Sequence, residues 1–295
     1  MTPALPPAVA AWQAGGQLVA TDAGRIFVRR GAGRGTPTVL LLHGFPSSSF
    51  DFRGVTERLG RHPWLTLDFL GFGLSDKPRP HRYSLLEQAD IVQRVVTEFV
   101  SGPVVLLAHD MGTSVATELL ARDLAGELPF DLQAAVLTNG SVIIERASLR
   151  VSQKMLRGPL GPLAARLTNR AGFLRGFAKL FSADHPLSAE EAQAQWALMA
   201  REDGQRIIHL LCAYLNERVR YAARWHGAVR DWPKPLGFLW ATGDPVATVN
   251  VLAGLRALRP GAEVIELVGI GHYPQIEVPD AFTAGAARLL GLEAH

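Results

Sequence analysis

The sequence predicts an α/β fold, an eight-stranded and mostly parallel sheet flanked by helices, with an all-helical segment inserted near the middle of the chain. Three observations predict it. Short β-rich runs alternate with helical patterns along the chain. Several of the strand-like runs are continuously apolar, such as VVLLA at 104–108, which is typical of strands buried on both faces. One long middle segment has helical spacing of its apolar residues and no convincing strand.

The elements follow in a regular order. Strands are expected at 17–21, 26–30, 38–42, 64–68, 104–108, 134–138, 236–241 and 263–268. Helices are expected at 85–100, 112–122, 251–258 and 281–290. Between 142 and 230 the apolar spacing is helical, for example in 189–199 and 205–223. We therefore expect a core domain made of residues 1–141 and 231–295 and a helical cap domain, 142–230.

Composition excludes several classes of protein. The chain has 295 residues, 48% of them hydrophobic and 19% charged, as in an ordinary soluble globular protein. A net charge of +3 is too small to indicate nucleic acid without a motif. The single cysteine, Cys212, excludes an internal disulfide and a Cys-rich metal site. The first twelve residues do not resemble a signal peptide, and no apolar run of about 18 residues occurs, so we expect a cytoplasmic protein without a membrane span. We also expect no cofactor and no metal.

One stretch of the predicted cap, 146–179, is basic. Its cations are Arg146, Arg150, Lys154, Arg157, Arg166, Arg170, Arg175 and Lys179. We interpret them as the solvated faces of helices, with contact to an anion or a membrane as the alternative.

The strongest local motif is VVLLAHDMGTSVATELL, 104–120, in which an apolar strand runs into AHDMG and then a helix. Small residues such as Ala108 and Gly112 are needed where a sharp strand-to-helix turn lifts a nucleophile above the sheet. The residue at that position is Asp110. Taken alone, the segment is equally typical of an N-cap aspartate on an ordinary turn.

Two distant segments favour the nucleophile. PLGFLWATGDPV places Asp244 at the end of a strand, and ELVGIGHYPQ places His272 in a Gly-flanked loop after the next strand, 28 residues later. Nucleophile, acid and histidine in that chain order are typical of α/β-hydrolases. Another strand ends at HGFP, where the backbone N–H of Phe45 is expected to pair with that of Met111 as an oxyanion hole.

These motifs carry a resemblance. HGFP, GFGLSDKP, AHDMG, GDPV and GHYPQ together resemble the epoxide hydrolase and haloalkane dehalogenase branch of the α/β-hydrolases over nearly the whole chain. The segments YLNERVRYAARWHGAV and GHYPQIEVP most resemble mesoderm-specific transcript protein-like hydrolases within that branch. The resemblance implies the α/β-hydrolase fold, a cap domain and an Asp–His–Asp triad of Asp110, His272 and Asp244.

A carboxylate nucleophile narrows the reaction. Attack on an ester or amide would produce an anhydride, which is more activated than the substrate, whereas attack on an sp³ carbon gives an ordinary ester. His272, oriented by Asp244, would then activate water to hydrolyse that ester. A serine esterase is disfavoured because Ser114 lies past the turn, inside the helix.

The leaving group separates the alternatives. Haloalkane dehalogenases usually have a Trp directly after the nucleophile and often an Asn after HG, whereas this chain has Met111 and Phe45 there. Fluoroacetate dehalogenases have an Arg after the nucleophile, which Met111 also does not match. Halide release is therefore disfavoured, although Trp196 or Trp225 could supply an N–H donor.

An epoxide instead needs a general acid for its ring oxygen, and a tyrosine with a pKa of about 10 suits that task. Tyr214, 30 residues before Asp244, is the expected donor, with an ordinary amphipathic-helix position as the alternative and Tyr221 as the fallback. The second cap tyrosine of epoxide hydrolases is missing, since no Tyr lies between Tyr83 and Tyr214; Gln153 is the substitute donor that we consider.

The leading hypothesis is thus an epoxide hydrolase that converts a small hydrophobic epoxide and water to a vicinal diol, as a monomer or homodimer without nucleic-acid partners. A haloalkane dehalogenase with the same triad and a hydrolase-fold binding or signalling protein are the alternatives.

Overall fold

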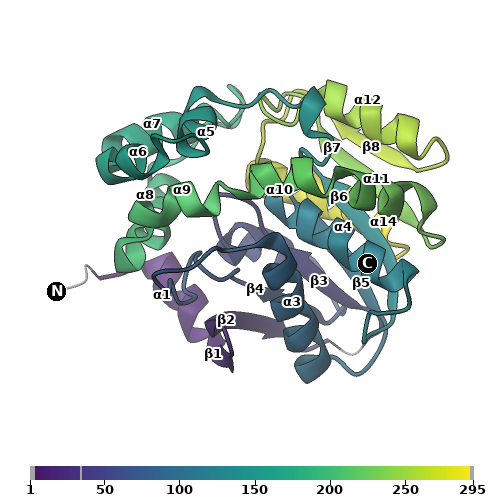
Figure 1. Ribbon diagram of the computed structural model, residues 1–295. Coiled ribbons are helices and arrows are strands. Elements are labelled where there is room, and N and C mark those ends of the chain that lie inside the picture. Colours follow the sequence, from purple (N-terminus) through teal and green to yellow (C-terminus); the bar gives the residue numbers. More distant parts are fainter. Residues whose placement is uncertain (1–3, 34, 293–295) are drawn as a thin grey trace.

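The computed structural model describes residues 4–33 and 35–292, and these form one eight-stranded sheet with helices on both faces (Figure 1). The strands are β1 (Gly16–Thr21), β2 (Gly24–Gly31), β3 (Thr38–Leu42), β4 (Trp64–Leu67), β5 (Val104–His109), β6 (Leu132–Thr138), β7 (Leu236–Ala241) and β8 (Val264–Leu267). Their order in the sheet is β1-β2-β4-β3-β5-β6-β7-β8. Only β2 pairs antiparallel with its neighbours; every other pair is parallel.

Within the described residues, seven α-helices accompany this sheet outside the segment between β6 and β7. They are α1 (Pro7–Ala14), α2 (Arg53–Thr56), α3 (Leu85–Phe99), α4 (Met111–Leu124), α12 (Val249–Leu258), α13 (Pro274–Glu277) and α14 (Pro279–Leu289), with a short 3₁₀ helix, η1 (Ser49–Phe52), before α2. Between β6 and β7 the chain is helical, through η2 (Ile144–Arg146), α5 (Val151–Leu156), α6 (Gly161–Leu167), α7 (Arg170–Ala178), α8 (Ala189–Ala200), η3 (Arg201–Ile207), α9 (Ile208–Leu211), α10 (Tyr214–Arg220) and α11 (Ala222–Asp231).

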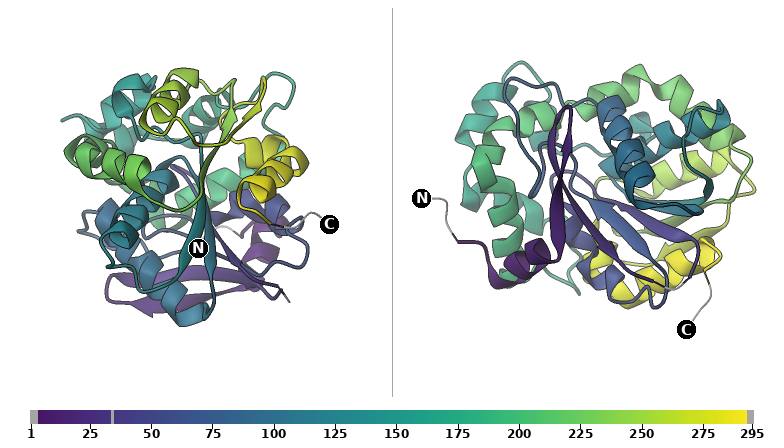
Figure 2. Two further views of the ribbon diagram at one scale, coloured as in Figure 1. Left: turned by 90° about the vertical axis from the view of Figure 1, so that its right-hand side faces the viewer. Right: turned by 90° about the horizontal axis from the view of Figure 1, so that it is seen from below.

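Alternation along the strands assigns each apolar side chain to one of two cores. On β3, Leu40 and Leu42 belong to the cluster that includes α3 and α4, whereas Val39 and Leu41 belong to the cluster that includes α2 and α14. This follows from the two-residue period of a strand. Figure 2 shows the two helical layers on opposite sides of the sheet. Because both faces are covered, the central strands contain continuous apolar runs, 39–42 in β3, 104–108 in β5 and 236–241 in β7, which confirms the sequence interpretation.

All eight strands occur where the sequence predicts them, within about two residues at either end. The predicted helix at 205–223 is interrupted, because the chain there forms η3, α9 and α10 in succession. The last helix of the segment, α11, packs against α4 beside the sheet, whereas α5, α6 and α7 stand above the carboxyl ends of the strands (Figure 1). The boundaries of a separate cap domain stay a prediction.

Among the residues that the structure describes, none of the helices is long and apolar enough to cross a membrane.

Candidate active site

The turn between β5 and α4 is strained at one residue, Asp110. Its backbone has φ 43° and ψ −110°, a conformation that side-chain-bearing residues rarely adopt. Although Asp110 occupies the N-cap position of α4, its side chain makes no capping hydrogen bond. The side chain is buried and turns instead toward the end of β3. The N-cap interpretation therefore does not account for this aspartate, and strain of this kind gathers at functional sites.

Close backbone approach explains the small residues around Asp110. A Cβ on Gly112 would lie 2.5 Å from the carbonyl oxygen of Leu42 and 2.6 Å from that of His43. A Cβ on Gly44 would lie 2.8 Å from the Cβ of Asp110. The first turn of α4 thus touches the end of β3, and only glycine fits at both contacts.

The two predicted oxyanion-hole residues meet at Asp110. Phe45 follows β3, and its backbone N–H donates to Oδ2 of Asp110 at 3.0 Å. Met111 is the first residue of α4, where backbone N–H groups have no acceptor within the helix. The positive end of the helix macrodipole also lies here, so the position favours a negative charge.

The predicted acid and histidine are in contact. Nδ1 of His272 lies 2.6 Å from Oδ2 of Asp244, and both side chains are buried. Asp244 also accepts hydrogen bonds from the side chain of Asn139, at 2.8 Å, and from the backbone N–H of Val246, at 2.7 Å. Burial raises the pKa of Asp244, but His272 and these donors outweigh it, so the pKa lies below its ordinary value.

The contact with Asp244 also shifts the pKa of His272. Burial lowers the pKa of His272, yet the charge and hydrogen bond of Asp244 outweigh burial and raise it above its ordinary value. A carboxylate on Nδ1 leaves Nε2 as the nitrogen available to take a proton from water.

Three positioning residues escaped the sequence interpretation. Besides Asn139, these are His109, whose Nε2 lies 2.7 Å from the backbone oxygen of His272, and Gln275, whose amide lies 3.2 Å from Nδ1 of His109. Burial lowers the pKa of His109 to about 4, so its ring is neutral at physiological pH and can donate from Nε2 and accept at Nδ1. The contacts of His109 with the His272 backbone and with Gln275 thus hold the loop that carries His272. For His109, the sequence offered one signal of such a role, namely its position directly before Asp110 in AHDMG.

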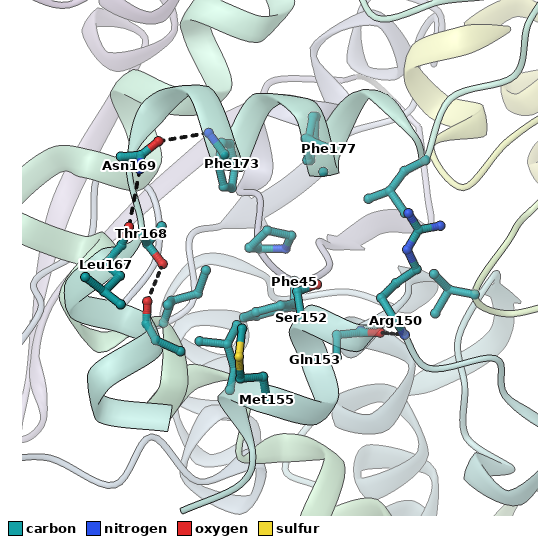
Figure 3. Close-up of a pocket in the computed structure, with 18 of the residues that line it drawn as sticks. Phe45, Arg150, Ser152, Gln153, Met155, Leu167, Thr168, Asn169, Phe173 and Phe177 are labelled. Atoms are coloured by element: carbon teal, nitrogen blue, oxygen red, sulfur yellow. Dashed lines mark hydrogen bonds between the residues drawn. The ribbon is translucent and has the colours of Figure 1, made fainter. Parts of the chain in front are cut away.

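A cavity of about 430 Å³ opens above His272 and Phe45. Its remaining walls come mainly from α5, α6 and α7. In Figure 3, Phe173 and Phe177 point from α7 toward the side where α5 carries Gln153 and Met155. The lining is largely apolar, with few polar groups, as in sites for small hydrophobic ligands.

Tyr214, the predicted proton donor, is buried beside Asp110 at the start of α10. Neither of these two residues is among those that line the cavity, which reaches this site at Phe45 and His272. Its ring centroid lies 5.5 Å from that of Phe45. Among the residues that the structure describes, its hydroxyl has no hydrogen-bond partner, although the side chain is only 2% exposed. Burial, and next the charge of Asp110, raise its pKa well above the ordinary value, so the hydroxyl stays protonated.

The two other donors that the sequence suggested are Tyr221 and Gln153. Tyr221 packs its ring 5.5 Å from that of Trp225 and does not line the cavity. Gln153 does line the cavity, but its side-chain oxygen accepts the backbone N–H of Arg150 at 2.9 Å. The Gln153 side chain also interacts with the Tyr214 hydroxyl and lowers the pKa of Tyr214 against the larger effect of burial, although the two side chains form no hydrogen bond of ordinary geometry.

Arg218 is the main residue that the sequence interpretation missed. It is fully buried, and its Nη2 donates to the backbone oxygen of Asp110 at 2.8 Å and lies 3.6 Å from Oδ1 of the same residue. Nε donates to the hydroxyl of Ser114 at 2.8 Å, whereas Nη1 has no acceptor among the described residues. One signal was visible: an arginine on the apolar stripe of α10, one turn after Tyr214.

The two tryptophans considered as halide donors, Trp196 and Trp225, are not positioned for that role. The indole N–H of Trp225 donates to Glu118 at 3.0 Å. Trp196 packs its ring 5.6 Å from that of Phe173 and does not line the cavity. Among the described residues, no cluster of three or more His, Cys, Asp or Glu side chains is arranged to hold a metal ion.

Comparison with known proteins agrees with this geometry. Residues 37–279 match the family described as alpha/beta hydrolase fold. The LipZ protein of Mycobacterium tuberculosis (strain ATCC 25618 / H37Rv) is 66% identical over 96% of this chain and 98% of its own length. The mesoderm-specific transcript homolog protein of Homo sapiens is 37% identical over 95% of this chain and 87% of its own length, which confirms that resemblance.

A solved structure shows the same fold. Haloalkane dehalogenase DbeA from Bradyrhizobium elkani USDA94 superposes with a TM-score of 0.79 at 22% identity, covering 94% of this chain and 97% of that one. The family match over most of the chain and the relatives at 66% and 37% identity lead to one conclusion: the chain belongs to the α/β hydrolase fold family and is a hydrolase of that superfamily.

Proposed function

We propose that this protein is an epoxide hydrolase that opens its substrate through a covalent ester on Asp110. The observation that carries the proposal is the buried hydroxyl of Tyr214, which lies beside Asp110 and forms no hydrogen bond of ordinary geometry with a described residue. Buried polar groups are normally hydrogen-bonded, so an unpaired donor here calls for an acceptor supplied by a ligand. The ring oxygen of an epoxide, bound for attack by Asp110, is such an acceptor.

In the first step, Oδ1 of Asp110 is the attacking atom, because Oδ2 is held by the N–H of Phe45. Oδ1 forms a bond to one ring carbon while the carbon–oxygen bond of the epoxide breaks. The electron pair of that bond moves to the ring oxygen, which takes the proton of the Tyr214 hydroxyl. The result is an alkyl ester on Asp110 that carries a neighbouring hydroxyl group.

In the second step, Nε2 of His272 takes a proton from water, and the hydroxide attacks the carbonyl carbon of the ester. The negative charge that develops on the carbonyl oxygen is stabilised by the N–H groups of Phe45 and Met111. When the intermediate collapses, the bond between the carbonyl carbon and Oδ1 of Asp110 breaks, and Oδ1 leaves with the alkyl group. The leaving oxygen takes the proton of the newly formed carboxyl group and becomes the second hydroxyl of the diol, so that Asp110 is left as a carboxylate that contains one oxygen from water. The proton on His272 returns through solvent to the Tyr214 phenolate, which restores the site.

The experiment uses His272→Ala with styrene oxide and an aliphatic epoxide. Without a base the second step stops, so intact-protein mass spectrometry should show an adduct of substrate mass, located on the peptide that contains Asp110. Asp110→Ala should form no adduct and no diol. An unmodified His272→Ala protein, together with full turnover by Asp110→Ala, would sink the proposal.

One observation favours haloalkane dehalogenation as a second candidate. Nη1 of Arg218 is a buried N–H donor without an acceptor among the described residues, and it belongs to a guanidinium beside Asp110. A halide leaving group needs a donor of this kind. The triad would act in the same way, with halide in place of alkoxide. Release of bromide or chloride from short haloalkanes, without diol formation from epoxides, would favour this reaction over the first.

A further inference from the structure

The helices that cover the cavity carry positive charge without any negative charge. Residues 146–183 contain eight Arg or Lys residues and no Asp or Glu. Six of the eight are exposed, namely Arg146, Lys154, Arg166, Arg170, Arg175 and Lys179. None of the eight forms an ion pair with another described residue. Their charge is therefore available to an anionic partner.

Large apolar side chains are exposed in the same segment. Ten are exposed among the described residues, and five of these lie on or between α5 and α6: Val151 (79% exposed), Met155 (49%), Leu160 (62%), Leu163 (54%) and Leu167 (69%). We call these five residues the α5–α6 rim. Single exposed apolar residues are ordinary, but a cluster of this kind marks a contact surface.

The rim is continuous with the mouth of the cavity. Met155, Leu160, Leu163 and Leu167 are exposed to solvent and also line the cavity that leads to His272 and Phe45. A partner seated on the rim would therefore meet the entrance of the site directly. Solvation of the basic helix faces, the interpretation favoured by the sequence, does not explain why the aliphatic side chains between the cations are exposed.

We propose that α5, α6 and α7 dock this protein on the surface of an anionic lipid bilayer. The aliphatic side chains of the α5–α6 rim enter the boundary between headgroups and acyl chains, and the cations around them bind lipid phosphates. Basic amphipathic surfaces with aliphatic anchors bind membranes in this peripheral manner, without a spanning helix. An apolar substrate dissolved in the bilayer then enters the cavity without crossing water.

Two other occupants fit less well. A second copy of the chain would bring its own eight uncompensated cations against these eight in a two-fold interface, and like charges repel. Nucleic acid would satisfy the cations, but aromatic stacking is its usual apolar contact, and the rim is entirely aliphatic. A bilayer satisfies the cations and the aliphatic side chains together.

The experiment is flotation of the full chain with vesicles of phosphatidylcholine alone or with phosphatidylglycerol. It requires no turnover, so its result is independent of the proposed reaction. We expect binding to the mixed vesicles at low salt, weaker binding at high salt because of screening, and little binding to phosphatidylcholine alone. Arg166→Glu/Arg170→Glu should lower the partition coefficient by at least about thirtyfold, since each of the two removed cations contributes about a fivefold factor and each added carboxylate is repelled by the anionic surface.

Matched controls separate the surface from general effects. Arg82→Glu/Arg94→Glu makes the same change in net charge at exposed residues outside the segment and should bind like the wild type. Leu163→Glu on the rim should abolish binding, whereas Leu124→Glu, at a 46% exposed leucine on α4, should not.

Equal binding of the rim variants and their controls would overturn the proposal, as would equal binding to neutral and anionic vesicles. The absence of vesicle binding would also overturn it, whether or not the chain binds DNA or forms a dimer that Leu163→Glu dissociates.

Discussion

The guanidinium of Arg218 and the carboxylate of Asp110 form a buried pair, with Nη2 3.6 Å from Oδ1 and a second contact to the Asp110 backbone at 2.8 Å. Both side chains are at most 3% exposed. In the proposed reaction, Asp110 attacks carbon as a carboxylate, and a buried charge of this kind is costly unless it is paired. Arg218 supplies the compensating charge, and its bond to Ser114 holds it in place.

The first prediction concerns this pair. Arg218→Met should lower the free energy of unfolding by about 3–5 kcal/mol, because it leaves the Asp110 charge buried and unpaired. Asp110→Asn/Arg218→Met should lose less than the two single variants added together, since the charge and its partner are removed at once. Urea unfolding of the wild type and three variants measures the coupling, and strictly additive losses would contradict it.

The second prediction separates stability from activity at Tyr214. Tyr214→Phe should slow ester formation by about 10²–10⁴-fold, because the ring oxygen loses its acid. The same change should leave the protein as stable as the wild type or more stable by about 1 kcal/mol, because it removes a buried hydroxyl without a partner among the described residues. Tyr221→Phe is the matched control and should change neither quantity. Single-turnover kinetics measures the rate of ester formation, and urea unfolding measures the free energy of unfolding. A loss of stability without a loss of rate would mean that Tyr214 contributes only to packing.

The third prediction concerns the acid limb of ester hydrolysis. In the proposed reaction, His272 accepts the proton of water only when its ring is neutral, and its pKa lies above the ordinary value because Asp244 favours the charged ring. Hydrolysis should therefore increase as pH rises through that raised pKa. Asp244→Asn removes the favouring charge, so the midpoint should move to lower pH while the plateau rate falls. Rates of ester decay between pH 5 and 9 test it, and an unmoved midpoint would argue against this pair as the titrating unit.

The fourth prediction concerns stability and a carboxylate outside the triad. Asp51 in η1 contacts Ser47 and accepts from Gln195 of α8 at 2.8 Å. Burial, with the charge of Glu191 adding to it, raises the pKa of Asp51 to about 7. Because the unfolded chain ionises near its ordinary value, the folded state holds the extra proton between these two values. Stability should then fall with rising pH across roughly pH 4–7, by about 1.4 kcal/mol per unit from this group.

Asp51→Asn keeps the shape and removes the titration. Urea unfolding between pH 5 and 8 should show a flatter profile for this variant than for the wild type, and the variant should be the more stable of the two at pH 8. Parallel profiles would mean that Asp51 ionises in the folded protein as it does in the unfolded chain.

The sheet and the order of the predicted triad could be read from the sequence because their signals are local. A strand that is buried on both faces must be apolar at every position, as in VVLLA, and a tight turn must carry small residues, as Gly112 does. Asn139 and His109 were missed although each lies at a strand end and His109 stands within AHDMG, because each acts only by holding another residue in place. Their contribution exists only through Asp244 and His272.

The sequence by itself determined that Asp110, Asp244 and His272 would gather, because the carboxyl ends of neighbouring parallel strands meet at one edge of a sheet. Only the tertiary structure decided which sides of α10 and of the helices above the sheet face the site and which face solvent. A periodic pattern shows that a helix has an apolar stripe but not what the stripe faces. Packing of α10 placed Arg218 beside Asp110 and left the Tyr214 hydroxyl without a well-aligned hydrogen bond among the described residues. Packing of α5 and α6 left the α5–α6 rim exposed beside the mouth of the cavity.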